Sequence, residues 1–281
     1  MLIFIAILFA GALFAGFIGS LTGLGGGVII VPLLTIGMGV DIHYAIGTSL
    51  ISVIATSSGA TSAYLKEGIL NIRIGMFLEI ATTLGAIAGA AIAVFAPTQA
   101  IAVIFGFVLL YSAIVSFLKS KEIVDKEIPQ ETKSGWLIEL LKAKGTYPTA
   151  NGFKNYTLQN LGGGFIVMTF AGILSGLLGI GSGALKVIAM DSVMKIPFKV
   201  STSTSNFMIG VTAAASAGIY LNRGYIDPVL SMPVMVGVLI GSLVGAKFLI
   251  RSHTKSIRLV FAIVITLLAF EMIFNGLAKN I

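Results

Sequence analysis

One glycine-rich stretch occurs twice in this chain, first as Gly23-Leu-Gly-Gly-Gly-Val-Ile-Ile-Val-Pro32 and again, 156 residues later, as Gly179-Ile-Gly-Ser-Gly-Ala-Leu-Lys-Val187. The same shift aligns residues 16–118 with residues 172–274 without a gap, and 22 of these 103 positions are identical. The identities cluster on glycine and hydroxyl residues, which apolar composition alone does not produce. The sequence therefore predicts two repeats, 1–118 and 162–281, joined by a linker at 119–161.

The composition excludes a soluble protein, because 57% of the residues are apolar and only 10% are charged. About 20 apolar residues span a bilayer, and in lipid only helices and closed barrels satisfy the backbone. The apolar runs are continuous rather than alternating, so we expect an all-α polytopic membrane protein with about ten transmembrane helices. The N-terminus lacks a basic leader region and is expected to form the first span. The apolar runs are 2–19, 24–40, 45–65, 74–96, 100–118, 163–180, 184–196, 200–221, 229–250 and 257–275.

The basic residues indicate how the repeats are oriented. If each repeat crosses five times, the repeats are inverted, and 15 of the 18 Lys and Arg residues lie on the linker side against two on the other. If the second run of each repeat were re-entrant and left four crossings, the partition would be 11 to 6. The positive-inside rule favours two inverted five-helix repeats in the cell membrane, with a cytoplasmic linker and both termini outside.

Within the linker, Trp136, Leu137, Leu140 and Leu141 fall on one helical face. This pattern is typical of a short interfacial helix that lies on the membrane. A helix packed against the transmembrane core is an equally good interpretation.

Several classes of site are excluded by residue type. The chain has no cysteine, and its two histidines, His43 and His253, are far apart, so we expect no metal site and no cofactor. No Ser–His or paired-Asp arrangement supports an enzyme. The net charge of +7 is explained by orientation in the membrane and does not indicate nucleic acid as a partner.

Clustered glycines bend or unwind a membrane helix and free backbone N–H groups, and the following helix adds the positive end of its dipole. Two such breaks at matching positions are typical of substrate sites in secondary transporters, whereas tight helix packing is the alternative. We therefore expect a small anion to bind there. The residues assigned to these breaks are Gly25, Gly26, Gly27, Gly181, Ser182 and Gly183. The Gly85/Gly89 and Gly241/Gly245 pairs, in contrast, predict only close helix contact.

A second shared segment, at 45–50 and 201–206, is rich in hydroxyl groups. Hydroxyls in helices often donate to carbonyls of their own helix, but five hydroxyls and an amide at 201–206 exceed that need. Such donors suit an oxyanion. The expected substrate contacts in this segment are Thr48, Ser49, Thr204, Ser205 and Asn206.

Lys186 lies inside an apolar run, just past the second glycine cluster. An ionisable residue within a span marks a pathway or an ion pair, so Lys186 could bind the anion or pair with Asp191. Glu79 also lies within a run. Glu79 and Asp191 are the candidates for proton coupling, and a structural hydrogen bond is the alternative for Glu79.

Residues 23–32 and the segment Ala45-Ile-Gly-Thr-Ser-Leu50 resemble the amino-terminal signature of the sulfite exporter TauE/SafE family, and the second repeat matches it more loosely. Ile188 stands in place of Pro32, and Ser203 in place of Gly47.

The resemblance implies export of sulfite or an organosulfonate, driven by protons or by the membrane potential. We expect a secondary transporter that works by alternating access. An anion channel, or a carrier for another small carboxylate or oxyanion, is the alternative. The sequence is compatible with a homodimer as the oligomeric state.

Overall fold

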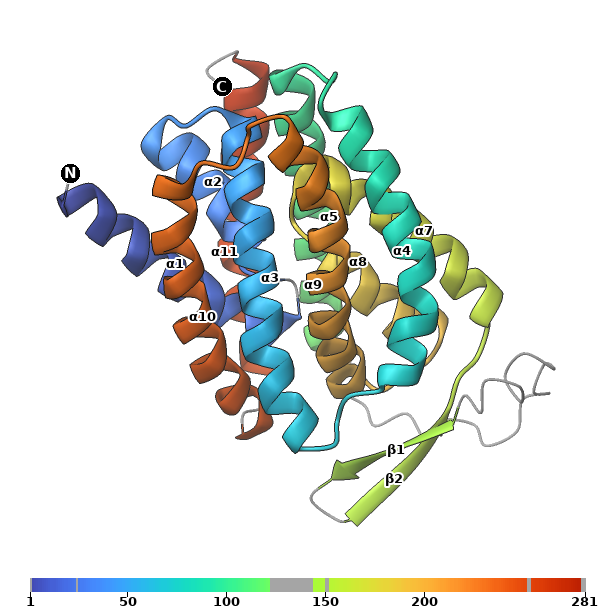
Figure 1. The fold of residues 1–281 in the computed structure, drawn as a ribbon. Coiled ribbons are helices and arrows are strands. Elements are labelled where there is room, and N and C mark those ends of the chain that lie inside the picture. The colour runs from blue at the N-terminus through green and yellow to red at the C-terminus, as the bar shows by residue number, and fades with distance from the viewer. Residues whose placement is uncertain (1, 24, 122–143, 150–151, 252–253, 279–281) are drawn as a thin grey trace.

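A computed structural model describes residues 2–23, 25–121, 144–149, 152–251 and 254–278 as a bundle of helices with one small hairpin (Figure 1). Each apolar run of the sequence contains a helix, as expected where only helices satisfy the backbone in lipid. The helices and strands are α1 (Leu2–Thr22), α2 (Gly27–Met38), α3 (Ile42–Lys66), α4 (Ile72–Ala93), α5 (Thr98–Lys121), β1 (Lys144–Thr149), β2 (Gly152–Thr157), α7 (Leu161–Leu178), α8 (Gly183–Ile188), a π-helical turn (Ala189–Val193), α9 (Phe198–Asn222), α10 (Pro228–Arg251) and α11 (Thr254–Leu277).

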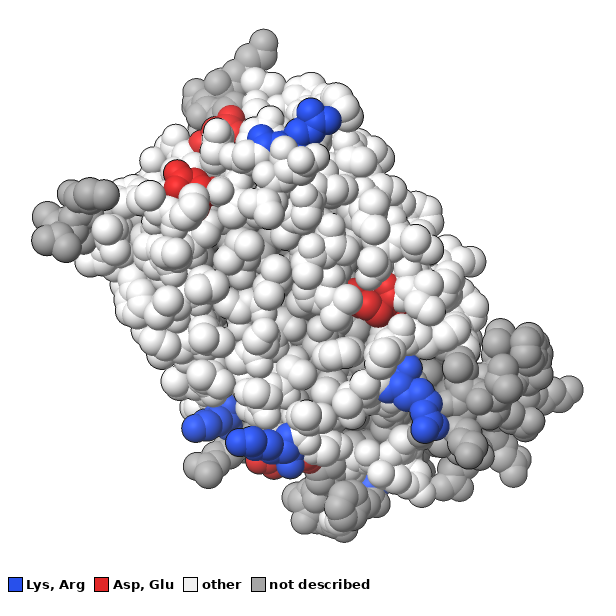
Figure 2. All heavy atoms as spheres, in the orientation of Figure 1, with Lys and Arg blue, Asp and Glu red and all other residues white. Residues whose placement is uncertain are grey.

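Four helices of the described residues, α1, α4, α7 and α10, are long and apolar enough to cross a membrane. Large apolar side chains such as Leu84, Phe170 and Leu267 point outward and are exposed, which suits a lipid-facing surface. Figure 2 shows a face whose middle band is almost wholly uncharged, with most charged atoms toward its two ends. These features confirm an all-α polytopic membrane protein.

The second apolar run of each repeat forms a short helix. At about 1.5 Å per residue, the 12 residues of α2 extend roughly 18 Å and the 6 residues of α8 roughly 9 Å. The hydrocarbon core is about 30 Å thick, so neither helix alone is long enough to cross it. Contacts of Gly11 with Leu33, and of Gly19 with Gly25, fold α2 back along α1.

Glycines bring two pairs of helices into close contact. Gly241 of α10 lies against the carbonyl of Leu13, and Gly245 lies against that of Phe17, so α1 and α10 run in the same direction. Gly85 and Gly89 of α4 contact α7 in the same manner. In both pairs a Cβ atom would overlap the backbone of the neighbouring helix. The prediction of close helix contact at these motifs is therefore confirmed.

A buried tyrosine makes the same contact in each repeat. The Tyr64 hydroxyl donates to the Ser20 carbonyl (2.7 Å), and the Tyr220 hydroxyl donates to the Gly176 carbonyl (3.3 Å). Donor and acceptor both shift by 156 residues between the two bonds. The alignment of the sequence thus extends to the packing of α3 on α1 and of α9 on α7.

Part of the polar linker forms the antiparallel hairpin β1–β2, in which Tyr147 pairs with Lys154. The strands carry aromatic and threonine residues, which favour extended backbone. Tyr156 of β2 is buried, and its hydroxyl accepts a hydrogen bond from the Asn71 side-chain amide (2.7 Å). Burial raises the pKa of Tyr156, and the hydrogen bond from Asn71 offsets part of that effect. The expected interfacial helix around Trp136 lies outside the described residues.

Candidate functional site

The two glycine breaks meet inside the bundle. Gly25 and Gly181 have φ angles of 76° and 69°, which glycine adopts readily and other residues rarely do. These turns end α1 and α7 and start α2 and α8. A Cβ atom on Gly27 would lie 3.0 Å from the Gly179 carbonyl oxygen, so the breaks are in direct contact.

Two of the expected hydroxyl residues connect each repeat to the break of the other. The Ser49 hydroxyl donates to the Gly179 carbonyl at 2.7 Å. The Ser205 hydroxyl lies 2.9 Å from the Gly23 carbonyl and 3.2 Å from the Gly183 carbonyl. Both serines are fully buried. The structure thus gives these hydroxyls a definite role, which is to hold the carbonyl groups of the breaks.

Asn206 and two further polar residues lie beside the same breaks. The Asn206 amide nitrogen lies 3.1 Å from the carbonyls of Ser20 and of Thr202. The Ser182 hydroxyl, the Thr202 hydroxyl and the Asn206 side-chain oxygen are buried and make no hydrogen bond within the described part of the chain. Buried polar atoms are normally paired, so each of these atoms has unused hydrogen-bonding capacity.

Thr48 and Thr204 are buried but make contacts in other directions. Thr48 lies 3.5 Å from the Ser231 hydroxyl at the start of α10. Thr204 accepts a hydrogen bond from the backbone N–H of Asn71 (3.2 Å), the residue that also bonds the hairpin Tyr156. Thr204 is therefore linked through Asn71 to the linker hairpin.

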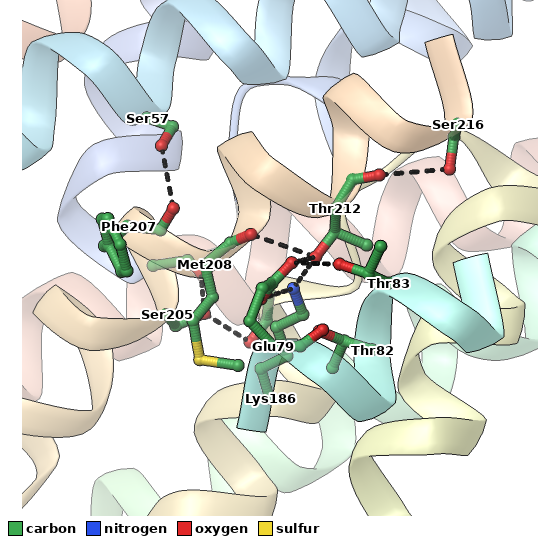
Figure 3. A network of polar contacts seen from close by, with 12 residues as sticks. Ser57, Glu79, Thr82, Thr83, Lys186, Ser205, Phe207, Met208, Thr212 and Ser216 are labelled. Carbon is green, nitrogen blue, oxygen red and sulfur yellow. Dashed lines mark hydrogen bonds and ion pairs between the residues drawn. The ribbon is translucent and has the colours of Figure 1, made fainter. Parts of the chain in front are cut away.

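Lys186 and Glu79 form a buried ion pair (Figure 3). The Lys186 Nζ atom of α8 lies 3.6 Å from Glu79 Oε2 of α4, and the lysine side chain is wholly buried. The ammonium also donates to the Thr212 hydroxyl of α9. Glu79 Oε1 accepts hydrogen bonds from Thr212 (2.5 Å) and Thr83 (3.1 Å). One charge of each sign is thus held between three helices.

The backbone of Lys186 lies close to the second glycine break. The backbone N–H of Lys186 donates to the carbonyl of Ser182, within the first turn of α8. Asp191, the partner considered from sequence spacing, lies in the π-helical turn that follows. Sequence reasoning singled out Lys186 and Glu79 separately and missed Thr212, although Thr212 matches Thr56 in the aligned repeats.

Comparison with known proteins agrees with the architecture. The family model described as "Sulfite exporter TauE/SafE" matches residues 8–272. The probable membrane transporter protein YunE of Bacillus subtilis is 28% identical to this chain, and the match covers 94% of this chain and 96% of YunE. The probable membrane transporter protein YdhB of the same organism is also 28% identical, and the match covers 88% of this chain and 89% of YdhB. A probable membrane transporter protein of Haemophilus influenzae is 23% identical, with 96% of this chain and 95% of its own covered. No solved structure matches the chain. This chain belongs to the sulfite exporter TauE/SafE family and is a membrane transporter rather than an enzyme.

Proposed function

We propose that this transporter moves a small oxyanion, such as sulfite or an organosulfonate, across the cell membrane by alternating access. The observation that carries the proposal is the meeting of two glycine breaks beside the fully buried Lys186. The amides of Ile29 and Ile30 donate to the Gly26 carbonyl, whereas those of Gly27 and Val28, at the start of α2, have no acceptor within their helix and can donate to an anion. The α2 dipole favours a negative ligand at the first break, and the buried positive charge of Lys186, three residues past Gly183, favours one near the second.

The hydroxyl residues support both binding and movement. The hydroxyls of Ser182 and Thr202, which have no hydrogen-bond partner among the described residues, are donors that an oxyanion can use. Ser49 and Ser205 each join one repeat to the break of the other, so displacement of one repeat changes the contacts at both breaks. Such coupling is what alternating access around a fixed site requires.

The topology in this proposal is an inverted repeat. In each repeat the first two helices form a broken hairpin that starts and ends on the same side, and the next three cross the membrane. Three crossings per repeat, in place of the five expected from the apolar runs, are still an odd number, so the second repeat is inverted relative to the first. The parallel pairs α1–α10 and α4–α7 support this arrangement, because each joins the first helix of one repeat to the fourth helix of the other, so the same contact occurs twice. The linker side is then cytoplasmic by the positive-inside rule, and export is the direction that the family description favours.

Counterflow in proteoliposomes tests the site. Ser205→Ala removes a hydroxyl that bonds the carbonyls of both breaks. A hydrogen bond contributes about 1 kcal/mol, so we expect sulfite counterflow to fall roughly five- to tenfold. Ser58→Ala is the matched control, because the exposed Ser58 hydroxyl bonds only the carbonyl of Ile54 in its own helix. Equal counterflow in both variants would contradict the proposed site.

A further inference from the structure

The carboxylate of Glu79 is bonded unequally at its two oxygens. Oε1 accepts hydrogen bonds from Thr212 and Thr83. Oε2 makes no hydrogen bond within the described residues and lies 3.6 Å from the Lys186 ammonium. A proton taken up by this carboxylate would therefore occupy Oε2, the oxygen that faces Lys186.

The neighbouring helices contribute few other charges. Helix α7, which packs against α4, carries no ionisable side chain, and the ionisable residues of α9 are Lys199 and Tyr220, near its two ends. Asp191 belongs to the turn after α8, and Arg73 to the first turn of α4. Lys186 is therefore the charge that faces Glu79 across the helix interface.

The charge balance changes when an anion enters. Without an anion, the ammonium and the carboxylate neutralise one another. An anion beside Lys186 adds a second negative charge to a buried site, where an uncompensated charge is strongly unfavourable. A proton on Glu79 restores neutrality and releases the ammonium to the anion, so proton uptake and anion binding favour one another.

We propose that Lys186 alternates between Glu79 and the transported anion, so that each anion travels with one proton held on Glu79 Oε2. The inference rests on the proposed anion transport and adds its coupling ion. One proton and one anion enter from water on one side, and both leave on the other, after which the ion pair re-forms. The empty site is neutral, and so is the site loaded with a monovalent anion and a proton. With a divalent anion and a proton, the loaded site carries one net negative charge.

The proposal fixes the relative direction of the two fluxes. Proton and anion move together, so an outward anion gradient exports both, and an inward proton gradient drives the anion inward. At one proton per anion, a gradient of one pH unit supports about tenfold accumulation, because one pH unit is equivalent to a tenfold concentration ratio of protons.

Glu79→Gln tests the coupling in proteoliposomes with labelled sulfite. The amide keeps the shape of the side chain but carries no exchangeable acidic proton, so Lys186 remains available to the anion. Counterflow at equal pH exchanges anions without net proton movement and should remain measurable, whereas the roughly tenfold accumulation driven by an inward proton gradient should be lost. Glu271→Gln, at an exposed carboxylate of α11, is the matched control and should retain both activities.

The outcomes separate this inference from the proposed function. Absence of sulfite counterflow in wild type would overturn the proposed function and this inference with it. Proton-driven accumulation by Glu79→Gln, with normal counterflow in wild type, would overturn this inference but not the proposed function. Loss of counterflow in a Glu79→Gln protein that remains monodisperse and folded would do the same. If Glu79→Gln does not fold, the wild-type protein alone tests the inference. A pH-sensitive dye trapped in alkaline vesicles should report one proton entering for each sulfite taken up. A ratio of protons to sulfite near zero would overturn the inference.

Discussion

Replacing Lys186 by methionine removes one half of the buried ion pair and keeps the length and apolar stem of the side chain. The Glu79 carboxylate then loses the ammonium 3.6 Å away, while its bonds from Thr212 and Thr83 remain. Both side chains are buried, at 0% and 8% exposure, so solvent cannot replace the missing charge. The carboxylate becomes an uncompensated charge in the interior.

The magnitude follows from the burial of both partners. Removing one member of a buried ion pair destabilises a protein by about 3–5 kcal/mol, whereas replacing both by apolar residues is often nearly neutral. One kcal/mol shifts the melting temperature of a domain of similar size by about 2–4 °C, so Lys186→Met should lower Tm by roughly 10 °C. The double variant Glu79→Leu/Lys186→Met should melt within a few degrees of wild type.

Thermal unfolding of the purified proteins in detergent measures these shifts, and the four proteins of the double-mutant cycle give the coupling between the two residues. Lys66→Met, at an exposed position in the last turn of α3, is the control and should leave Tm unchanged. A Tm for Lys186→Met close to that of Lys66→Met would refute the reasoning. So would a double variant whose loss equals the sum of the two single losses.

Two further predictions concern packing and the linker hairpin. Gly176→Ala should destabilise the protein by about 1–3 kcal/mol, because its Cβ would overlap the Ala86 carbonyl of α4. Gly218→Ala, at a position with open space around it, should stabilise the protein by about 0.4–1 kcal/mol. Equal melting temperatures for the two variants would contradict this prediction. Tyr156 should remain neutral in the folded protein, since burial raises its pKa above the ordinary value of 10.0, so stability falls as pH rises above about 10. Tyr156→Phe should flatten that alkaline slope in thermal melts, and an unchanged slope would count against it.

The helices were predictable because the membrane leaves the backbone few alternatives. Apolar runs at 45–65 and 229–250 correspond to α3 and α10 within a few residues. The glycine breaks were predictable because closely spaced glycines recur at matching positions of the two repeats, at 23–27 and 179–183, which helix packing alone does not require. The lengths of α2 and α8 were not, because an apolar run shows where a segment is buried and not where its helix ends.

The partners of the buried polar groups depended on packing that no spacing reveals. Lys186 and Glu79 are 107 residues apart and have no counterparts in the opposite repeat, so the alignment could not pair them. The substitution of Ser203 for Gly47 is explained by the structure. Gly47 leaves room for the Tyr225 carbonyl, whereas the Ser203 hydroxyl donates to the equivalent carbonyl of Ile69 (2.8 Å).

The most direct test of the central claim is sulfite counterflow by the wild-type protein in proteoliposomes. Vesicles loaded with unlabelled sulfite should transiently accumulate labelled sulfite from outside, because a carrier exchanges one anion for another at a single site. An equal concentration of a potassium salt without a transported anion should not replace the internal sulfite. Uptake that is indifferent to internal sulfite would indicate a channel, and exchange supported only by a cation would contradict an anion site at the glycine breaks.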